Sequence, residues 1–442
     1  MYLKKIKFKE YFANSGKMRI FADESCRKSK VSSMEISKAN NMNQIKRENY
    51  LQTLIELRDK NLIKVLTGVR RCGKSTVMQM FRDYLIADGV SENQIVFLNL
   101  EDYENSKWLN DSEGLYYHIV GQLDLSKPCY VFLDEIQQVK EFERLAAGLH
   151  VKSNLDLYAT GSNAYILSSE LGTLLTGRYI SIHILPFSFK EFLLTQTYTS
   201  RVEMFAKYMD SGGMPGTFEL PENTIRNYIQ DVIENIIQKD VLVRNKWRNT
   251  DHFNKTTAFL FDTIGSVISP QKITNTLKSN GIAISRNTIE SYIQALVESY
   301  MFYKVKRFDL KGKGLLMTQE KYYAVDLGFK RYFLGAKNTA DLGHNLENIV
   351  YLELLRRGHQ IHIGKADDTE IDFVIQTPAG NREYIQVAWT AKEQSTFERE
   401  VRPFERIKDF NKRTLLTTDV EPVTDYKGIQ KINVIDWLLN DQ

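Results

Sequence analysis

The segment 68–76 has the sequence GVRRCGKST, and it constrains the fold more than any other part of the chain. An apolar, β-branched run at 62–67 precedes it, and apolar residues recur every three or four positions from Val77 to Leu85. A strand, a G-x-x-x-x-G-K-[ST] loop and an amphipathic helix in this order are typical of a phosphate-binding loop, or P-loop. The sequence therefore predicts an α/β core in which a parallel sheet presents a nucleotide site.

The residues of this loop have separate expected roles. Its glycines let backbone N–H groups point at phosphate oxygens, and the helix N-terminus adds a positive dipole. Lys74 would reach the β- and γ-phosphates of ATP, and the Ser75 hydroxyl would bind Mg²⁺. The rest of the expected nucleotide site is Gly68, Arg71, Cys72, Gly73 and Thr76. Cys72 is either a small loop residue or a redox-sensitive thiol, because a helix N-terminus lowers the pKa of a thiol.

An apolar run that ends in two carboxylates supplies the second half of the site. Residues 130–133 are Tyr-Val-Phe-Leu, as in a buried parallel strand, and Asp134 and Glu135 follow. We expect Asp134 to hold Mg²⁺ and Glu135 to polarise the attacking water as general base. The alternative for Glu135 is a surface residue at a strand end. The pair favours water over a substrate hydroxyl as nucleophile, and no N-K-x-D tetrapeptide indicates a GTPase.

Two later strand ends carry further candidates. The run 155–160 leads into Gly161-Ser-Asn163, where the amide of Asn163 would touch the γ-phosphate or serve only in a turn. Arg178 precedes the apolar run 179–185. It would neutralise transition-state charge, in its own subunit or in a neighbour's, or it is a solvated residue.

These residues resemble a known family. The segments GVRRCGKST, LDE, ATGSNAYILSSELGTLLTGR and LPFSFKEF, with YMDSGGMPG at 208–216, are similar to prokaryotic AAA-type ATPases that carry a C-terminal domain related to restriction endonucleases. The resemblance implies a RecA-like ATPase core, a helical lid, a winged-helix segment and a nuclease-like module. It also makes Asn163 similar to the sensor-1 residue of such ATPases.

The domain organisation follows from length and pattern, because 442 residues argue for two to four domains. Apolar residues at helical spacing predict a long helix at 222–245, and Ser269-Pro270 and Ser285 are typical helix starts. We expect five segments: a basic flexible tail (1–44), the ATPase core (45–200), a helical lid (201–255), a winged-helix-like segment (256–335) and a restriction-endonuclease-like module (336–442).

Excess positive charge is concentrated in two segments of the chain. Residues 1–47 carry 12 Lys/Arg and 4 Asp/Glu, and residues 270–331 carry 11 and 5. Both segments could neutralise DNA phosphates. The alternatives are solvated disorder for the tail and protein contacts for the winged helix.

The C-terminal module departs from the nuclease pattern that the resemblance implies. Glu347, Asp372 and Gln386 match the expected metal-binding positions, whereas Ala388 stands where the catalytic lysine belongs. The site is therefore expected to be degenerate and inactive, unless a migrated lysine such as Lys392 replaces the missing one.

The predicted function is a Mg²⁺-dependent ATP hydrolase that acts as a switch or motor on nucleic acid. The alternative is a nucleotide-gated switch that binds a protein, or another copy of the chain, and hydrolyses ATP slowly. The 3 cysteines include no C-x-x-C pair, and no apolar run reaches the length that spans a bilayer. We therefore expect a cytoplasmic protein with no membrane partner.

Overall fold

The computed structural model describes residues 45–440 except 165, 167–174, 243–244, 246, 248–249, 311–313, 336–340 and 367. The side chains of 314–319 are also left out. The chain divides into two units, Met1–Ile45 and Lys46–Gln442, and the described elements belong to the second. The basic tail expected at 1–44 lies outside the described residues.

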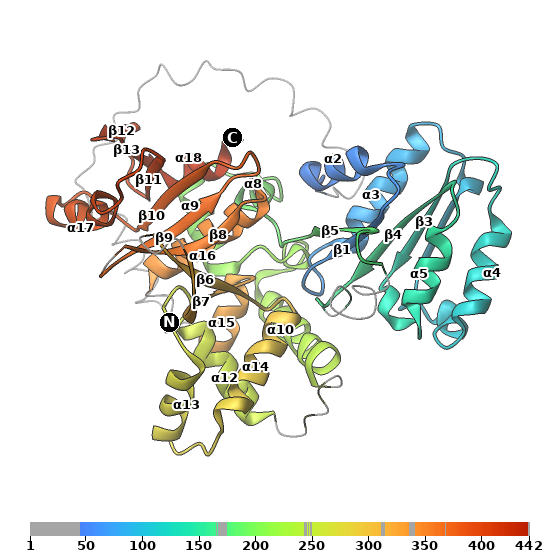
Figure 1. Cartoon of the computed structure of the whole chain (residues 1–442), viewed down its shortest axis with the longest axis horizontal. Coiled ribbons are helices and arrows are strands. Elements are labelled where there is room, and N and C mark those ends of the chain that lie inside the picture. The colour runs from blue at the N-terminus through green and yellow to red at the C-terminus, as the bar shows by residue number, and fades with distance from the viewer. Residues whose placement is uncertain are drawn as a thin grey trace. The chain divides into compact units, whose positions relative to one another are not determined.

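The first sheet of the second unit carries the P-loop, and its five strands are parallel in the order β2-β3-β4-β1-β5 (Figure 1). This confirms the predicted parallel α/β core. The strands are β1 (Ile63–Thr67), β2 (Ile95–Asn99), β3 (Cys129–Asp134), β4 (Leu155–Gly161) and β5 (Tyr179–His183). The α-helices are α2 (Glu48–Leu57), α3 (Lys74–Ala87), α4 (Ser112–Gln122) and α5 (Phe142–His150), and the short 3₁₀-helices are η2 (Glu92–Gln94), η3 (Tyr103–Trp108) and η4 (Ile136–Gln138).

Alternating side chains of these strands pack into two apolar layers. Leu66 and Phe132 lie with Phe81 of α3, whereas Val65 and Val131 lie with residues of α4 and α5. Both faces of the sheet are thus covered, which explains why β1, β3 and β4 are buried along their whole length. The strand order places β4 between the P-loop strand and the strand that ends in Asp134.

A helical region follows the first sheet. It contains α8 (Phe189–Leu193), α9 (Arg201–Ser211), η5 (Pro215–Thr217), α10 (Glu222–Asn235), η6 (Ile236–Leu242), α12 (Asp251–Asp262), α13 (Pro270–Ser279), α14 (Arg286–Glu298) and α15 (Leu327–Leu334). Ser269 and Ser285 accept N-cap hydrogen bonds, as predicted. The helix expected at 222–245 is α-helical only to Asn235, because η6 continues it as a π-helix.

The second sheet has eight strands in the order β12-β13-β11-β10-β9-β8-β6-β7. They are β6 (Phe302–Asp309), β7 (Gly314–Ala324), β8 (Gln360–Ala366), β9 (Thr369–Gln376), β10 (Arg382–Ala388), β11 (Lys412–Thr417), β12 (Thr424–Tyr426) and β13 (Ile429–Asn433). Helices α16 (Leu342–Arg356), α17 (Gln394–Glu405) and α18 (Val434–Leu439) accompany them. The β6–β7 hairpin, which was expected to be a wing, belongs to the C-terminal sheet because β6 pairs in parallel with β8. The expected domain boundary at 335/336 therefore lies between strands of one sheet. The hairpin tip, 311–313, lies outside the described residues.

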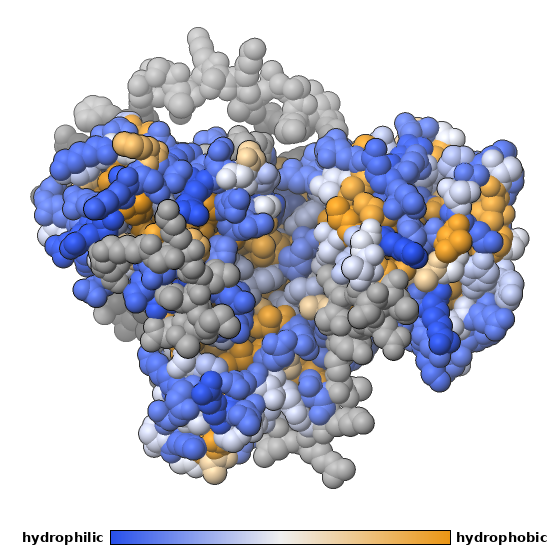
Figure 2. Space-filling view, viewed as in Figure 1, coloured by the Kyte–Doolittle hydropathy of each residue, from blue (hydrophilic) through white to orange (hydrophobic). Residues whose placement is uncertain are grey.

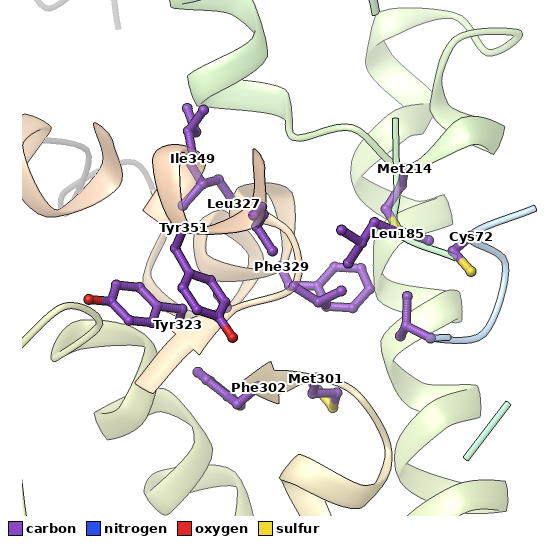
Figure 3. Packing of buried hydrophobic residues seen from close by; sticks show 14 of the residues in the cluster. Cys72, Leu185, Met214, Met301, Phe302, Tyr323, Leu327, Phe329, Ile349 and Tyr351 are labelled. Carbon is purple, nitrogen blue, oxygen red and sulfur yellow. The ribbon is translucent and has the colours of Figure 1, made fainter. Parts of the chain in front are cut away.

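One apolar cluster connects the P-loop with the helical region and the second sheet. Figure 3 shows Cys72 close to Leu185 and Met214, and Tyr351 beside Tyr323 of the same cluster, where the two rings stack. The outer face shown in Figure 2 is mostly hydrophilic where residues are described, with smaller hydrophobic groups between. No helix among the described residues is both long enough and apolar enough to cross a bilayer.

The segment 208–216 owes its adjacent glycines, Gly212 and Gly213, to close packing. A Cβ on Gly212 would overlap the carboxylate of Asp326, and the Gly213 N–H donates to Asp326 Oδ2 at 2.7 Å. Burial raises the pKa of Asp326 to about 7, although backbone N–H groups of Gly213 and Gly328 favour its ionised form. Pro215 of this segment lies within 4.0 Å of the position that a Cβ on Gly73 would take, so the segment reaches the P-loop.

A buried arginine holds the start of this unit against the loop. Arg47, 1% exposed, donates to both carboxylate oxygens of Glu191, to the Cys72 carbonyl at 3.0 Å and to the Leu185 carbonyl at 2.9 Å. Its neighbour Lys46 also pairs with a carboxylate, Glu48, but both side chains are about two-thirds exposed.

Arg47→Ala should lower the free energy of unfolding by about 3–5 kcal/mol, because it leaves Glu191 as a buried carboxylate without its cation. Lys46→Ala removes an exposed pair and should cost less than about 0.5 kcal/mol. Urea denaturation followed by circular dichroism compares the two variants. Equal losses would show that Arg47 does not hold the fold together.

Candidate nucleotide-binding and hydrolysis site

The P-loop adopts a backbone that requires its two glycines. Gly68 has φ +143° and Gly73 has φ +100°, both in the region that side chains disfavour. A Cβ on Gly68 would overlap the carbonyl oxygen of Ile184. Arg71 also has positive φ, at 67°. The loop therefore turns sharply before α3, and the helix N-terminus faces the space where phosphates would bind.

Two buried cationic side chains donate hydrogen bonds to carbonyl oxygens of the loop. Lys74 Nζ donates to the carbonyls of Gly68 (3.1 Å) and Val69 (3.2 Å), and Arg47 donates to that of Cys72. These bonds fix the loop in its curved form, in which backbone N–H groups at the start of α3 can bind an anion. Lys74 also lies 3.8 Å from Glu135.

Ser75 and Asp134 lie together at the carboxyl edge of the sheet. The Asp134 carboxylate accepts hydrogen bonds from the Ser75 hydroxyl and from Thr160 Oγ1, the latter at 2.5 Å. Burial raises the pKa of Asp134, and these two hydrogen bonds oppose the rise. The hydroxyl and the carboxylate suit Mg²⁺, which proteins commonly bind through one or two side chains together with nucleotide phosphates. Among the described residues, no group of three or more His, Cys, Asp and Glu side chains could hold a metal ion by itself.

Glu135 is a positioned side chain and not a surface residue. It is 7% exposed and has φ 56°, a conformation that costs about 1–3 kcal/mol in a non-glycine residue and often marks a functional site. Gln137 Nε2 donates to Glu135 Oε2 at 2.5 Å, and the Glu135 N–H donates to Thr160 Oγ1 at 2.8 Å. The carboxylate is thus held beside Lys74, where a general base for an attacking water is needed.

Thr160 and Gln137 are site residues that our sequence reasoning missed. Thr160 joins Asp134 to Glu135 because β4 lies next to β3 in the sheet. The sequence signal for Thr160 is a polar residue at the end of the run 155–160. Which residues its hydroxyl contacts depends on the order of the strands in the sheet.

Asn163 lies at the same sheet edge and also contacts the helical region. It is buried, and its amide donates to the backbone carbonyl of Asp240 in η6 at 3.4 Å. The adjacent Ser162 hydroxyl donates to the Asp240 carboxylate at 3.3 Å. The loop after β4 therefore contacts the π-helix as well as the nucleotide site.

Arg178 lies at the opposite edge of the sheet. It is exposed, and it directly precedes Tyr179, which pairs with Ile63 at the start of β1. The P-loop follows the other end of β1, after Thr67, so the length of the strand separates Arg178 from the phosphate site. This placement is unfavourable for a role of Arg178 at the phosphate site of its own chain. A role at a neighbour's site stays a prediction, and a solvated or structural residue stays its alternative.

Cys72 is placed as a structural residue. Its thiol is fully buried and donates to the Ile184 carbonyl at 3.2 Å. Burial raises the pKa of this thiol, which opposes thiolate formation. The redox alternative is therefore not supported.

Arg70, in a variable position of the loop motif, forms a second polar cluster at the site. Its guanidinium donates to Asp240 Oδ2 (3.1 Å) and Oδ1 (3.3 Å) and to Glu101 Oε1 (2.7 Å). Burial opposes the charged form of Arg70, but these carboxylates outweigh it and raise its pKa. Burial also raises the pKa of Asp240, against the effect of Arg70. Sequence reasoning could not predict the pairing of Arg70 with Asp240, because the two residues are 170 positions apart.

A second polar chain leaves the P-loop strand. Thr67 Oγ1 is 3.2 Å from His183 Nδ1, and His183 Nε2 is 2.6 Å from the Tyr303 hydroxyl in β6. Burial lowers the pKa of His183 to about 4, so the imidazole is neutral at physiological pH. This chain connects the end of β1 with the second sheet.

The residues expected to form a degenerate nuclease site lie close together, with Glu347 on α16, Asp372 on β9 and Gln386 on β10, and Lys321 lies among them. Lys321 Nζ in β7 lies 2.9 Å from Glu347, 2.8 Å from Glu370 and 3.7 Å from Asp372. Gln386 accepts from the Asp372 N–H at 3.2 Å. Lys321, and not the exposed Lys392, is thus the lysine that contacts these carboxylates.

Comparison with known proteins agrees with the nucleotide site. Residues 60–193 match the family model of an AAA domain, and residues 202–340 match a domain of unknown function. An uncharacterised protein of Haemophilus influenzae is 38% identical over 400 residues, which cover 89% of this chain and 98% of that protein. The chain belongs to the family of this protein. An uncharacterised protein of Methanocaldococcus jannaschii is 30% identical, with 85% of each chain covered.

Among solved structures, the Walker-type ATPase of Pyrococcus abyssi has 13% identity and a TM-score of 0.47, over 66% of this chain and 96% of that one.

Thr160→Val in the AAA domain should lower ATP turnover by about 10–100-fold, the usual cost of losing a group that orients site residues. Nucleotide affinity should change by less than about threefold, because the loop and Lys74 remain. Thr160→Ser keeps the hydroxyl and should retain most turnover. Steady-state kinetics with both variants test this, and unchanged turnover in Thr160→Val would remove Thr160 from the site.

Proposed function

We propose that the chain is a Mg²⁺-dependent ATP hydrolase that works as a nucleotide-driven switch. The observation that supports this most strongly is the position of Glu135, fixed in a strained backbone between Lys74 and Gln137 and one residue from Asp134. A purely structural strand end has no need of a buried carboxylate in this conformation.

The proposed reaction uses each residue in one role. The loop and the N-terminus of α3 bind the β- and γ-phosphates, and Lys74 turns from the loop carbonyls to their oxygens. Ser75 and Asp134 would hold Mg²⁺, which would neutralise phosphate charge when bound. Glu135 accepts a proton from water as the water oxygen bonds to the γ-phosphorus, and the bond to the β-phosphate oxygen breaks. ADP and inorganic phosphate are the products.

The same reasoning extends to partners. The order α12, α13, α14 and the β6–β7 hairpin supports a winged-helix segment at 256–335, and Lys272 and Lys278 on α13 are exposed. Arg286, Lys304 and Lys306 are exposed as well, whereas Lys321 and Lys330 are buried and Arg331 pairs with Asp210. The described part of the segment thus has fewer free surface cations than its composition predicts, which favours the alternative of a protein partner over DNA.

Turnover with and without double-stranded DNA separates these two functions. Stimulation by DNA that falls steeply with salt would assign nucleic acid as the partner. Turnover that DNA does not change would assign the protein-binding switch.

Lys74→Ala should abolish ATP binding, and Glu135→Gln should bind ATP normally while hydrolysis falls by about 10²–10⁴-fold. The exposed Lys140→Ala is the charge-matched control and should behave like wild type. Calorimetric titration measures binding, and single-turnover assays measure hydrolysis. Wild-type hydrolysis in Glu135→Gln would assign the general base to another residue.

We also propose that the C-terminal module has no nuclease activity, because the ammonium of Lys321 already pairs with the carboxylates that would bind a metal. Wild-type protein should leave single- and double-stranded DNA intact with Mg²⁺ or Mn²⁺, with or without ATP. A restriction enzyme in the same buffer is the positive control. Cleavage that disappears in Asp372→Ala would contradict this proposal.

A further inference from the structure

We propose that Arg70 binds the γ-phosphate of ATP and that this phosphate takes it from Asp240, so that the π-helical segment η6 senses which nucleotide is bound. This inference rests on the proposed ATP binding at the P-loop. It adds a residue and a direction of signalling that the loop motif does not contain.

The first support is the position of the pair. Arg70 belongs to the loop itself, between Gly68 and Lys74, and it is 7% exposed. Its charge interacts with that of Glu135, and the charge of Asp240 interacts with those of Glu135 and Lys74. The pair therefore lies beside the two side chains that would flank the γ-phosphate.

The second support is the balance of charge. Two carboxylates, Asp240 and Glu101, share the Arg70 guanidinium; Lys239 also pairs with Glu101 at 3.6 Å, so the cluster is balanced and Arg70 is the cation paired with Asp240. A γ-phosphate next to Asp240 would add further negative charge in a buried region. Guanidinium groups bind phosphate in the same bidentate manner as carboxylate, and the doubly charged phosphate is the stronger partner. Transfer of Arg70 to the phosphate relieves the repulsion.

The third support is the element that carries Asp240. Segment η6 is a seven-residue π-helix, a rare conformation that often occurs at functional sites. Ser162 and Asn163, at the end of β4, also bond Asp240. When Arg70 leaves, the segment loses its only guanidinium contact among the described residues, and its hydrogen bonds to the loop after β4 remain. The segment lies between α10 and α12 in the chain, so a change in its conformation would act directly on the helical region.

ADP lacks the γ-phosphate and should leave the Arg70–Asp240 pair intact. A pair with only a structural role would affect folding but would not distinguish ATP from ADP. The ratio of the two affinities is therefore the decisive readout.

The test uses the full chain with Glu135→Gln to prevent hydrolysis and compares Kd values for Mg·ATP and Mg·ADP. Asp240→Asn should lower the Kd of ATP about tenfold, since the phosphate no longer competes for Arg70, and should change the Kd of ADP less than twofold. Arg70→Gln should raise the Kd of ATP at least tenfold with little effect on ADP, and Arg70→Lys should lie between, because it keeps the charge.

Asp156→Asn is the matched control. It breaks another buried pair, Lys64–Asp156 at 2.5 Å, on the same sheet but at the edge away from the P-loop. It should leave both Kd values unchanged. An ATP-to-ADP ratio that stays constant in Asp240→Asn and Arg70→Gln would overturn the inference. Failure of the parent Glu135→Gln chain to bind either nucleotide would instead contradict the proposed function.

Hydrogen exchange tests the sensing step separately. Amides of 236–242 should exchange faster with ATP than with ADP in the Glu135→Gln chain, and equally with both nucleotides in Arg70→Gln. Equal exchange in the Glu135→Gln chain itself would show that η6 does not respond to the nucleotide.

Discussion

The P-loop can present N–H groups to an anion only if its carbonyls find donors elsewhere. In this protein the donors are buried cations: Lys74 bonds the carbonyls of Gly68 and Val69, and Arg47 bonds that of Cys72. Arg47 in turn is neutralised by Glu191, whose own helix α8 follows the first sheet. The loop shape, the start of the described chain and the helical region thus depend on one set of buried charges.

This set of charges also explains why the nucleotide site has contacts in several directions. Arg70 bonds Asp240 in η6, and Thr67 connects through His183 to Tyr303 in the second sheet. The loop after β4 adds a third contact, since the Ala164 N–H donates to the Glu298 carbonyl at the end of α14. Each contact begins within a few residues of a group that would bind phosphate or metal. A change at the nucleotide has physical routes to the rest of this unit.

The local part of this organisation could be predicted from sequence, because a strand, a glycine loop and an amphipathic helix are neighbours in the chain. The same holds for Asp134 and Glu135 at the end of an apolar run. Thr160 and Asp240 could not be placed in this way, since their contacts depend on which strands are adjacent and on where a distant π-helix lies. Lys321 was counted as part of a basic surface, yet the pairing of β6 with β8 turns it toward Glu347 and Glu370. The separation of Arg178 from the P-loop could have been predicted from sequence. A residue that precedes one parallel strand and a loop that follows another lie at opposite ends of the strands.

The most direct test of the account is the structure of the Glu135→Gln chain bound to Mg²⁺ and ATP. We expect the β- and γ-phosphates to lie over the loop 68–76 and the metal to lie beside Ser75 and Asp134. Lys74 should have turned from the carbonyls of Gly68 and Val69 to the phosphates. Nucleotide bound elsewhere, or Lys74 still bonded to those carbonyls at full nucleotide occupancy, would contradict it.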